Sequence, residues 1–181
     1  MQIDPKYFNT FLVIVALVAA SLITFFTLQN RSNEKSAFKE RIASNDSLQT
    51  VYWQQVQKSD SIRIADFKGN FVVLNFWANW SDATIESQQE LATLKSQYND
   101  TLQVIAAAVG LQKKEALDFI AEHKFPFHFV AGSRQFSDLS VPGLPAQLIF
   151  NPEGKLQTVF LGYQNESQYD SLRSLLSNGY K

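Results

Sequence analysis

The side chains that could carry out covalent or metal chemistry are few in this chain. Its 181 residues contain no cysteine and two histidines, His123 and His128. The lack of cysteine excludes disulfides, thiolate metal ligands and a cysteine nucleophile. Two histidines also argue against a multi-histidine metal site. We therefore expect neither a metal nor any other cofactor.

One short segment has the residue types of a site at the start of a helix. Trp77-Ala-Asn-Trp80 ends an apolar run and is followed by Ser81 and Asp82. Serine is a favoured N-cap, and an acidic residue in the first turn suits the helix dipole. A nucleophilic serine needs a neighbouring base, and neither histidine is adjacent in the sequence. The residues favour Ser81 as a helix cap over a hydrolytic role.

The elements that would position this segment alternate along the chain. Apolar runs predict strands at 50–57, 62–64, 71–77, 102–109, 127–130, 147–150 and 156–161. Helical spacing of apolar residues predicts helices at 82–98, 113–123 and 167–177. This order indicates an α/β fold with a mostly parallel central sheet flanked by helices. A C-terminal hairpin through Asn151-Pro-Glu-Gly-Lys155 would add an antiparallel edge, so we expect a mixed sheet.

The N-terminal part predicts one transmembrane helix. Residues 7–30 carry no charge, and as a helix they would span roughly 36 Å. A cleaved signal peptide has a shorter apolar region, and Ala19-Ala20-Ser21 lies inside the run rather than after it. We expect a short segment at 1–6, an anchor at 7–30, a polar juxtamembrane linker at 31–47 and one domain at 48–181.

Composition narrows the classes of partner. The chain is 45% hydrophobic, which argues against wholesale disorder, and its formal net charge is −1. The 16 Lys and Arg are scattered among 17 acidic residues, so there is no basic face for nucleic acid.

Several motifs together resemble one family. Asn75-Phe-Trp-Ala-Asn-Trp80 is similar to the NFWAxWCxxC segment of membrane-anchored thioredoxin-like proteins of the TlpA/ResA type, within the AhpC/TSA–redoxin group. The turn Asp66-Phe-Lys-Gly-Asn70, the pair Glu90-Leu91 and the stretch from Val141-Pro-Gly-Leu-Pro145 to Lys155 agree in order and spacing. The resemblance covers the chain from about Leu48 and implies a thioredoxin-like fold.

The departures from the family pattern lie in its active site. The two redox cysteines fall on Ser81 and Thr84, and the residues between them are Asp82 and Ala83. A serine hydroxyl is far less acidic than a thiol and cannot form a disulfide. The degenerate motif Ser81-Asp-Ala-Thr84 therefore predicts no catalytic residue and no thiol–disulfide oxidoreductase activity from this chain alone.

A peptide-binding groove is the function that could survive this loss. In the resembled family Pro145 is the cis-proline, and the residue before it, here Leu144, offers backbone groups to an extended peptide by β-strand addition. The expected groove consists of Trp80, Ser81, Asp82, Leu144 and Pro145, with Trp80 partly exposed and Trp77 in the core. The other interpretation, in which Pro145 only preserves the fold, stays open, and His128 is expected to be a structural strand residue.

Two functional classes follow from the resemblance. The first is a non-catalytic binding or scaffold module for envelope proteins, in a redox or cytochrome-maturation context. The second is a redoxin-family oxidoreductase in redox homeostasis whose thiols come from a partner. The resemblance places a single-pass protein in the bacterial cytoplasmic membrane with a periplasmic domain. The basic residues Arg31, Lys35, Lys39 and Arg41 after the anchor favour the opposite orientation.

Overall fold

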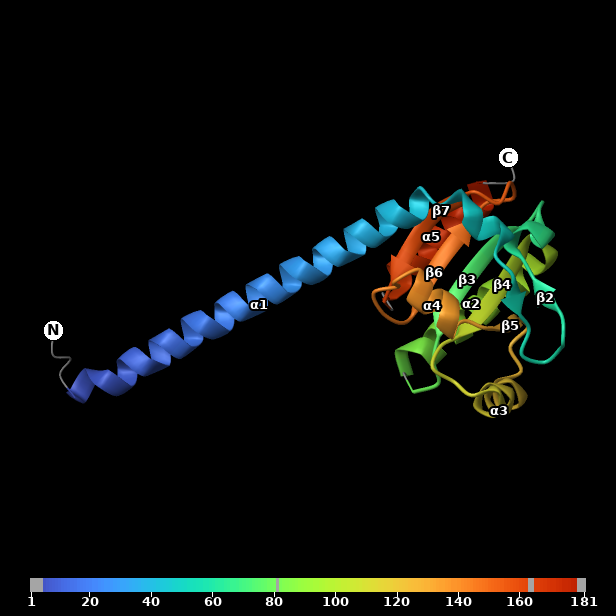
Figure 1. Cartoon of the computed structure of the whole chain (residues 1–181). Coiled ribbons are helices and arrows are strands. Elements are labelled where there is room, and N and C mark those ends of the chain that lie inside the picture. Colours follow the sequence, from blue (N-terminus) through green and yellow to red (C-terminus); the bar gives the residue numbers. More distant parts are fainter. Residues whose placement is uncertain (1–4, 81, 163–164, 179–181) are drawn as a thin grey trace. The chain divides into compact units, whose positions relative to one another are not determined.

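The computed structural model describes residues 5–80, 82–162 and 165–178. The chain divides into two compact units, with the division between Ala37 and Phe38. Figure 1 traces the long N-terminal helix α1 and the α/β domain that follows it.

Helix α1 runs without interruption over Pro5–Ala43. Its segment from Phe11 onward is long and apolar enough to cross a membrane, with a mean hydropathy of 2.7 over its most apolar window. Length and composition thus make it a candidate transmembrane span. Ser21, Thr24 and Thr27 each donate a hydroxyl hydrogen bond to the carbonyl four residues earlier, so these polar groups are satisfied within the helix.

The expected polar linker at 31–47 differs from the structure. The helix continues to Ala43, and Phe38 and Ile42, four residues apart on one side of it, are buried in the domain. Arg41 fixes this end of the helix, because its Nη2 donates to the Leu139 carbonyl at 2.7 Å and to the Ser140 carbonyl at 3.2 Å. Residues 38–47, which the sequence placed in the linker, belong to the compact domain.

The domain is built on a five-stranded mixed sheet in the order β5-β4-β3-β6-β7. The pairs β3–β4 and β4–β5 are parallel, while β3–β6 and β6–β7 are antiparallel. The strands are β3 (Phe71–Trp77), β4 (Leu102–Ala108), β5 (His128–Ala131), β6 (Ala146–Phe150) and β7 (Leu156–Leu161). The expected C-terminal hairpin is confirmed, and it makes half of the strand pairings antiparallel.

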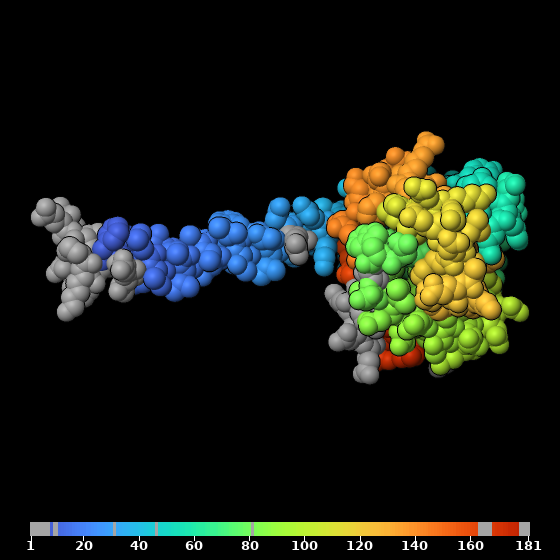
Figure 2. Space-filling model, turned by 90° about the horizontal axis from the view of Figure 1, so that it is seen from below, coloured from blue at the N-terminus to red at the C-terminus, as the bar shows by residue number. Residues whose placement is uncertain are grey.

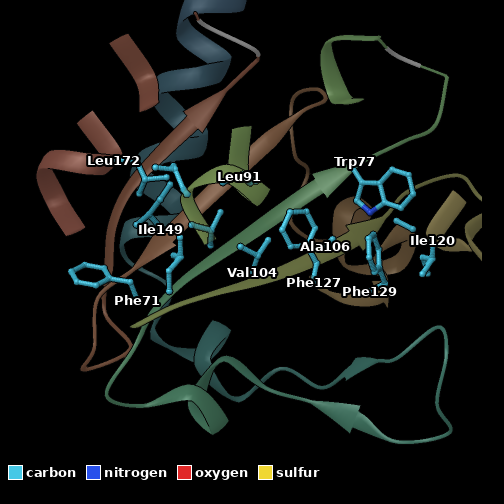
Figure 3. Packing of buried hydrophobic residues seen from close by; sticks show 14 of the residues in the cluster. Phe71, Trp77, Leu91, Val104, Ala106, Ile120, Phe127, Phe129, Ile149 and Leu172 are labelled. Carbon is cyan, nitrogen blue, oxygen red and sulfur yellow. The ribbon is translucent and has the colours of Figure 1, made fainter. Parts of the chain in front are cut away.

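The two faces of the sheet have separate cores. Helices α2 (Asp82–Tyr98), α3 (Lys113–His123) and α5 (Asn165–Asn178) cover one face, where the rings of Trp77 and Phe119 pack at a tilt with their centroids 4.3 Å apart. Figure 3 shows this cluster along β3, from Phe71 at the start of the strand to Trp77 at its end. The other face is covered by the last turn and a half of α1 with the segments η1 (Asp46–Thr50), η2 (Ile64–Phe67) and α4 (Ser133–Asp138).

One local prediction is wrong, and one helix was not predicted. Residues 50–57 do not form one edge strand, because the segment first makes the 3-10 turn η1 and then only the short strand β1 (Trp53–Gln54). That strand pairs with β2 (Ser61–Ile62), and Gln55 bridges to Val130 beside the sheet. Helix α4 was not expected. Its start follows Gly132, where a Cβ would lie 2.7 Å from the Ala107 Cβ, so tight packing requires the glycine.

The buried end of α1 gives a first prediction. Ile42→Ala should lower the free energy of unfolding by about 2–5 kcal/mol, because Ile42 is fully enclosed in the second core. Lys39→Ala, on the exposed side of the same helix, should change it by less than about 0.5 kcal/mol. Urea unfolding of the full chain in detergent micelles, followed by tryptophan fluorescence, measures both. Equal stability of the two variants would contradict the docking of this helix end into the domain.

Candidate functional site

Two loops of the expected groove leave the sheet at the same edge. Strand β3 ends at Trp77 and strand β6 begins at Ala146, and the antiparallel register pairs Phe76 with Ala146. The residues that follow β3 and those that precede β6 therefore emerge side by side. The fold thus brings together the segments of the candidate site that lie more than sixty residues apart in the sequence.

The two tryptophans at this edge have opposite environments. Trp77 is fully buried in the core, as expected. Trp80, three residues later in a turn, is 72% exposed. Figure 2 shows the stretch that includes the start of α2, in green, at the surface of the domain. A large exposed aromatic ring next to a strand edge is a residue type enriched at protein–protein contacts.

The loop before β6 presents main-chain groups. The bond between Leu144 and Pro145 is cis, Leu144 is half-buried and Pro145 is buried. The Pro145 carbonyl accepts a 2.8 Å hydrogen bond from the Gly162 N–H. Among the described residues, neither the N–H nor the C=O of Leu144 has a hydrogen-bond partner. An unpaired N–H and C=O at a strand end can pair with an added extended chain.

The positions of the missing cysteines differ in what the structure shows. Ser81 lies outside the described residues, so its expected role as a helix cap stays a prediction. Asp82 is the exposed first residue of α2, and its negative charge would disfavour a thiolate or alkoxide beside it. Thr84 is completely buried. Its hydroxyl therefore cannot reach a reactant in solution.

Thr84 belongs to a buried polar layer between the sheet and α2. Thr84, Ser87 and Gln88 follow one another at helical spacing on the buried face of that helix. Below them, Asn75 of β3 is directly opposite Gln147 of β6. All five side chains are at most 1% exposed. They interrupt the apolar core on this face.

Half of this polar layer is well connected. The Gln147 Nε2 donates to the Ser87 Oγ at 2.8 Å, and its Oε1 accepts from the Gln168 Nε2 at 3.0 Å. The Tyr169 hydroxyl donates to the Ser87 carbonyl at 3.1 Å and lies equally close to the Ser87 Oγ. This network ties β6, α2 and α5 together.

The other three side chains of the layer have no hydrogen-bond partners within the described residues. The amide atoms of Asn75 and Gln88 and the Thr84 hydroxyl are buried without a hydrogen bond. A buried polar group without a partner costs roughly 1–3 kcal/mol. The network holds no carboxyl, amine or thiol, so what it offers beneath the start of α2 is hydrogen bonding rather than acid–base catalysis at neutral pH.

The sequence did not single out this layer, although it contained a signal. Asn75 interrupts the apolar run of β3, and Gln147 interrupts that of β6. Polar residues inside two strands that are buried on both faces indicate a polar interior. That these strands are neighbours, with the two residues in register, follows only from the fold.

His128 has a structural environment, consistent with its position in β5. Its Nε2 lies 3.4 Å from the Gln103 Oε1, and its ring packs against Phe67 at 4.8 Å between centroids. Burial lowers the pKa of His128 below its usual value, and the nearby charges of Lys95 and Lys58 lower it further. His128 is therefore held neutral near pH 7.

The polar layer gives a second prediction. Gln147→Leu should lower the free energy of unfolding by about 2 kcal/mol or more, because Ser87 and Gln168 lose their buried partner. Thr84→Val has nearly the same shape and removes a hydroxyl without a partner, so it should be neutral or slightly stabilising. Urea unfolding compares the two variants. If Thr84→Val lowered the free energy of unfolding as much as Gln147→Leu, the assignment of Thr84 as a buried hydroxyl without a partner would be contradicted.

With this geometry established, three comparisons place the chain among known proteins. The model of the AhpC/TSA family matches residues 46–159. The thiol-disulfide oxidoreductase ResA of Bacillus subtilis (strain 168) is 30% identical over 124 residues, which cover 65% of this chain and 68% of the relative. ResA of Oceanobacillus iheyensis is 23% identical over 153 residues, covering 82% and 78% of the two chains.

Solved structures agree on the fold. A putative thiol:disulfide interchange protein DsbE from Chlorobium tepidum superposes with a TM-score of 0.60 at 19% identity, covering 72% of this chain and 93% of the other. A secreted thiol-disulfide isomerase from Corynebacterium glutamicum gives a TM-score of 0.62 at 16% identity, covering 72% and 84%. The fold is thioredoxin-like, and the chain belongs to the AhpC/TSA family, as a redoxin of the TlpA/ResA type that carries no cysteine.

Proposed function

We propose that this protein is a membrane-anchored binding module that holds an extended segment of an envelope protein. The observation that carries the proposal is the unpaired main chain of Leu144 just before β6, at the end of the sheet where β3 leads to the exposed ring of Trp80. The Leu144 N–H and C=O would pair with the backbone of the segment, and Trp80 would contact its side chains.

The absence of cysteine is consistent with this role. Thiol–disulfide exchange needs a thiolate to attack and a second thiol to resolve the mixed disulfide. In this chain the corresponding positions hold Ser81 and Thr84. Main-chain recognition needs neither, so the groove can act where the redox chemistry cannot.

The location of the domain is part of the proposal. We place it outside the bacterial cytoplasmic membrane, with residues 7–30 as an uncleaved anchor, by analogy with the TlpA/ResA type. Four basic residues after the anchor favour the other orientation. Arg41, one of the four, has a structural role, because it donates to the carbonyls at the end of α4. The presence of Arg41 is therefore accounted for by these hydrogen bonds, whichever side of the membrane the domain is on.

A photo-crosslinking amino acid tests the groove, the partner class and the location together. Placed at position 80 of the full chain in intact cells, it should give a discrete adduct with an envelope protein. The matched control is the same amino acid at Tyr52. Tyr52 is 65% exposed but directly precedes β1 and is not part of the candidate groove, so it should not give this adduct. An adduct with a cytosolic protein would contradict the proposed location.

The identified partner then allows a direct measurement of the groove. A synthetic peptide of the crosslinked segment should bind Trp80→Ala at least about tenfold more weakly than the unchanged chain, since truncating an aromatic hot-spot residue typically costs about 2 kcal/mol or more. Tyr52→Ala should bind the peptide unchanged. Equal binding by the two variants would reject the groove as the binding site.

The competing oxidoreductase function predicts a different result. We expect the purified full chain to reduce a disulfide substrate such as insulin no faster than the buffer does, because it has no thiol. The double variant S81C/T84C should raise the rate above this background, since a thiol at the start of α2 would be activated by the helix dipole. Reduction by the unchanged chain, well above background, would overturn the non-catalytic role.

A further inference from the structure

A pocket of about 300 Å³ lies away from the groove, where the β1–β2 hairpin meets the ends of β4 and β5. Its walls come from the hairpin loop, the start of α3 and the start of α4, and it includes no residue of the candidate groove. The hairpin lies against β5 through Gln55, which bridges to Val130, and Figure 1 shows α3 below β5. The volume is at the lower end of that of small-molecule sites.

The inner wall of the pocket is apolar and made of small side chains. Val56, Ala108 and Ala116 line it and are between 2% and 6% exposed, and Ala131 lines it from the exposed end of β5. The wall is also firmly held. The Val56 N–H donates to the Phe129 carbonyl at 2.9 Å, which fixes the hairpin against β5. The space therefore suits a compact apolar group.

The rim of the pocket carries positive charge from two separate elements. Lys58 comes from the hairpin loop and Lys113 from the first turn of α3. Within the described part of the chain, neither ammonium group has an ion pair or a hydrogen bond. The Ser133 Oγ accepts from the Gly110 N–H at 2.9 Å, and its own hydrogen has no acceptor among the described residues.

The nearby acids are already engaged. The Asp60 Oδ1 accepts from the Gln55 Nε2 at 2.6 Å, and the Glu115 Oε2 accepts from the Gln112 N–H at 2.7 Å. Neither carboxylate forms an ion pair with Lys58 or Lys113, and both lysines are exposed to solvent.

The lysines of α3 occupy an unfavourable place for helix stability. Lys113 and Lys114 are its first two residues, where the positive end of the helix dipole repels cations by roughly 0.3–1 kcal/mol each. Local rules are broken in this way mostly at functional sites. A bound anion would turn this repulsion into attraction, because it would face both the dipole and the ammonium groups.

We propose that this pocket binds a small organic carboxylate, with its apolar body against the alanine-lined wall and its anionic group facing Lys58, Lys113 and the Ser133 hydroxyl. The carboxylate could belong to a free branched-chain acid or to the C-terminal residue of a peptide, which share this chemistry. The site is independent of the proposed groove function.

Ligand-observed saturation-transfer NMR on the full chain in detergent micelles tests the site, with empty micelles as the blank. The probes are 4-methylpentanoate, its neutral analogue 4-methylpentanamide, and N-acetyl-glycyl-leucine. We expect the acid to bind at least about tenfold more tightly than the amide. Lys58→Gln and Lys113→Gln should each weaken binding of the acid several-fold. Lys68 is exposed and lies outside the pocket, so Lys68→Gln should leave this binding unchanged.

A second variant separates the cavity from the charge. Ala131→Phe keeps both lysines and fills the pocket from its exposed end, so it should abolish binding of the acid while leaving the unfolding midpoint nearly unchanged. Tighter binding of N-acetyl-glycyl-leucine than of the free acid would assign the ligand to a peptide terminus, and weaker binding would assign it to a free acid. Equal binding of acid and amide, no binding of either, or unchanged binding in the lysine and Ala131 variants would overturn the proposal.

Discussion

Strand β3 is the constraint on which the rest of this domain depends. All seven of its residues are buried, and they alternate between two faces that must each be covered. Phe71, Val73 and Trp77 pack in the core beneath α2, α3 and α5. Val72, Leu74 and Phe76 pack in the core on the opposite face of the sheet. A central strand that needs two coverings requires the long connections and extra segments that surround it.

The second covering explains why the domain extends into α1. The segments η1, η2 and α4 are short, and Phe38 and Ile42 complete the layer that they begin. Arg41 joins this helix end to the carbonyls of Leu139 and Ser140. The loop that follows α4 leads directly to Leu144 and β6. The same face of the sheet therefore supports both the end of α1 and the loop that contains Leu144.

Family membership and chemistry separate at the start of α2. The strand, the helix and the proline loop of the redox proteins are retained, while the side chains that would transfer electrons are absent. Thr84 is buried against a polar layer rather than facing the groove. What a solute can meet at this edge is Trp80, the carboxylate of Asp82 and the backbone of Leu144. None of these groups is a thiol, so they cannot carry out thiol–disulfide exchange.

Much of the fold could be predicted because its main elements have strong local patterns. The apolar run at 71–77 and the helical spacing at 82–98 and 113–123 gave the observed bounds. Helix α4 has no such pattern in Ser-Arg-Gln-Phe-Ser-Asp, and it depends on the contact between Gly132 and Ala107. Strand β1 was overextended, since Trp53 and its neighbours pair with a short partner that only the folded hairpin defines.

The candidate site was predictable only in part. Motif spacing located Trp80, Leu144 and Pro145, and their shared edge follows from the sheet order. The missing hydrogen bonds of Leu144, the pocket near Lys113 and the polar layer depend on contacts between distant residues, which no local pattern encodes.

The boundary between Ala37 and Phe38 has a consequence for how the domain could be separated from the rest of α1. A protease that cuts the chain before Phe38 would release a domain with both cores complete. A cut between Ile42 and Leu48 would instead remove two buried side chains and the arginine that closes α4. The released fragment would lack part of its second hydrophobic core and would be less stable. The first few residues of the domain therefore decide whether cleavage yields a folded protein or a substrate for further degradation.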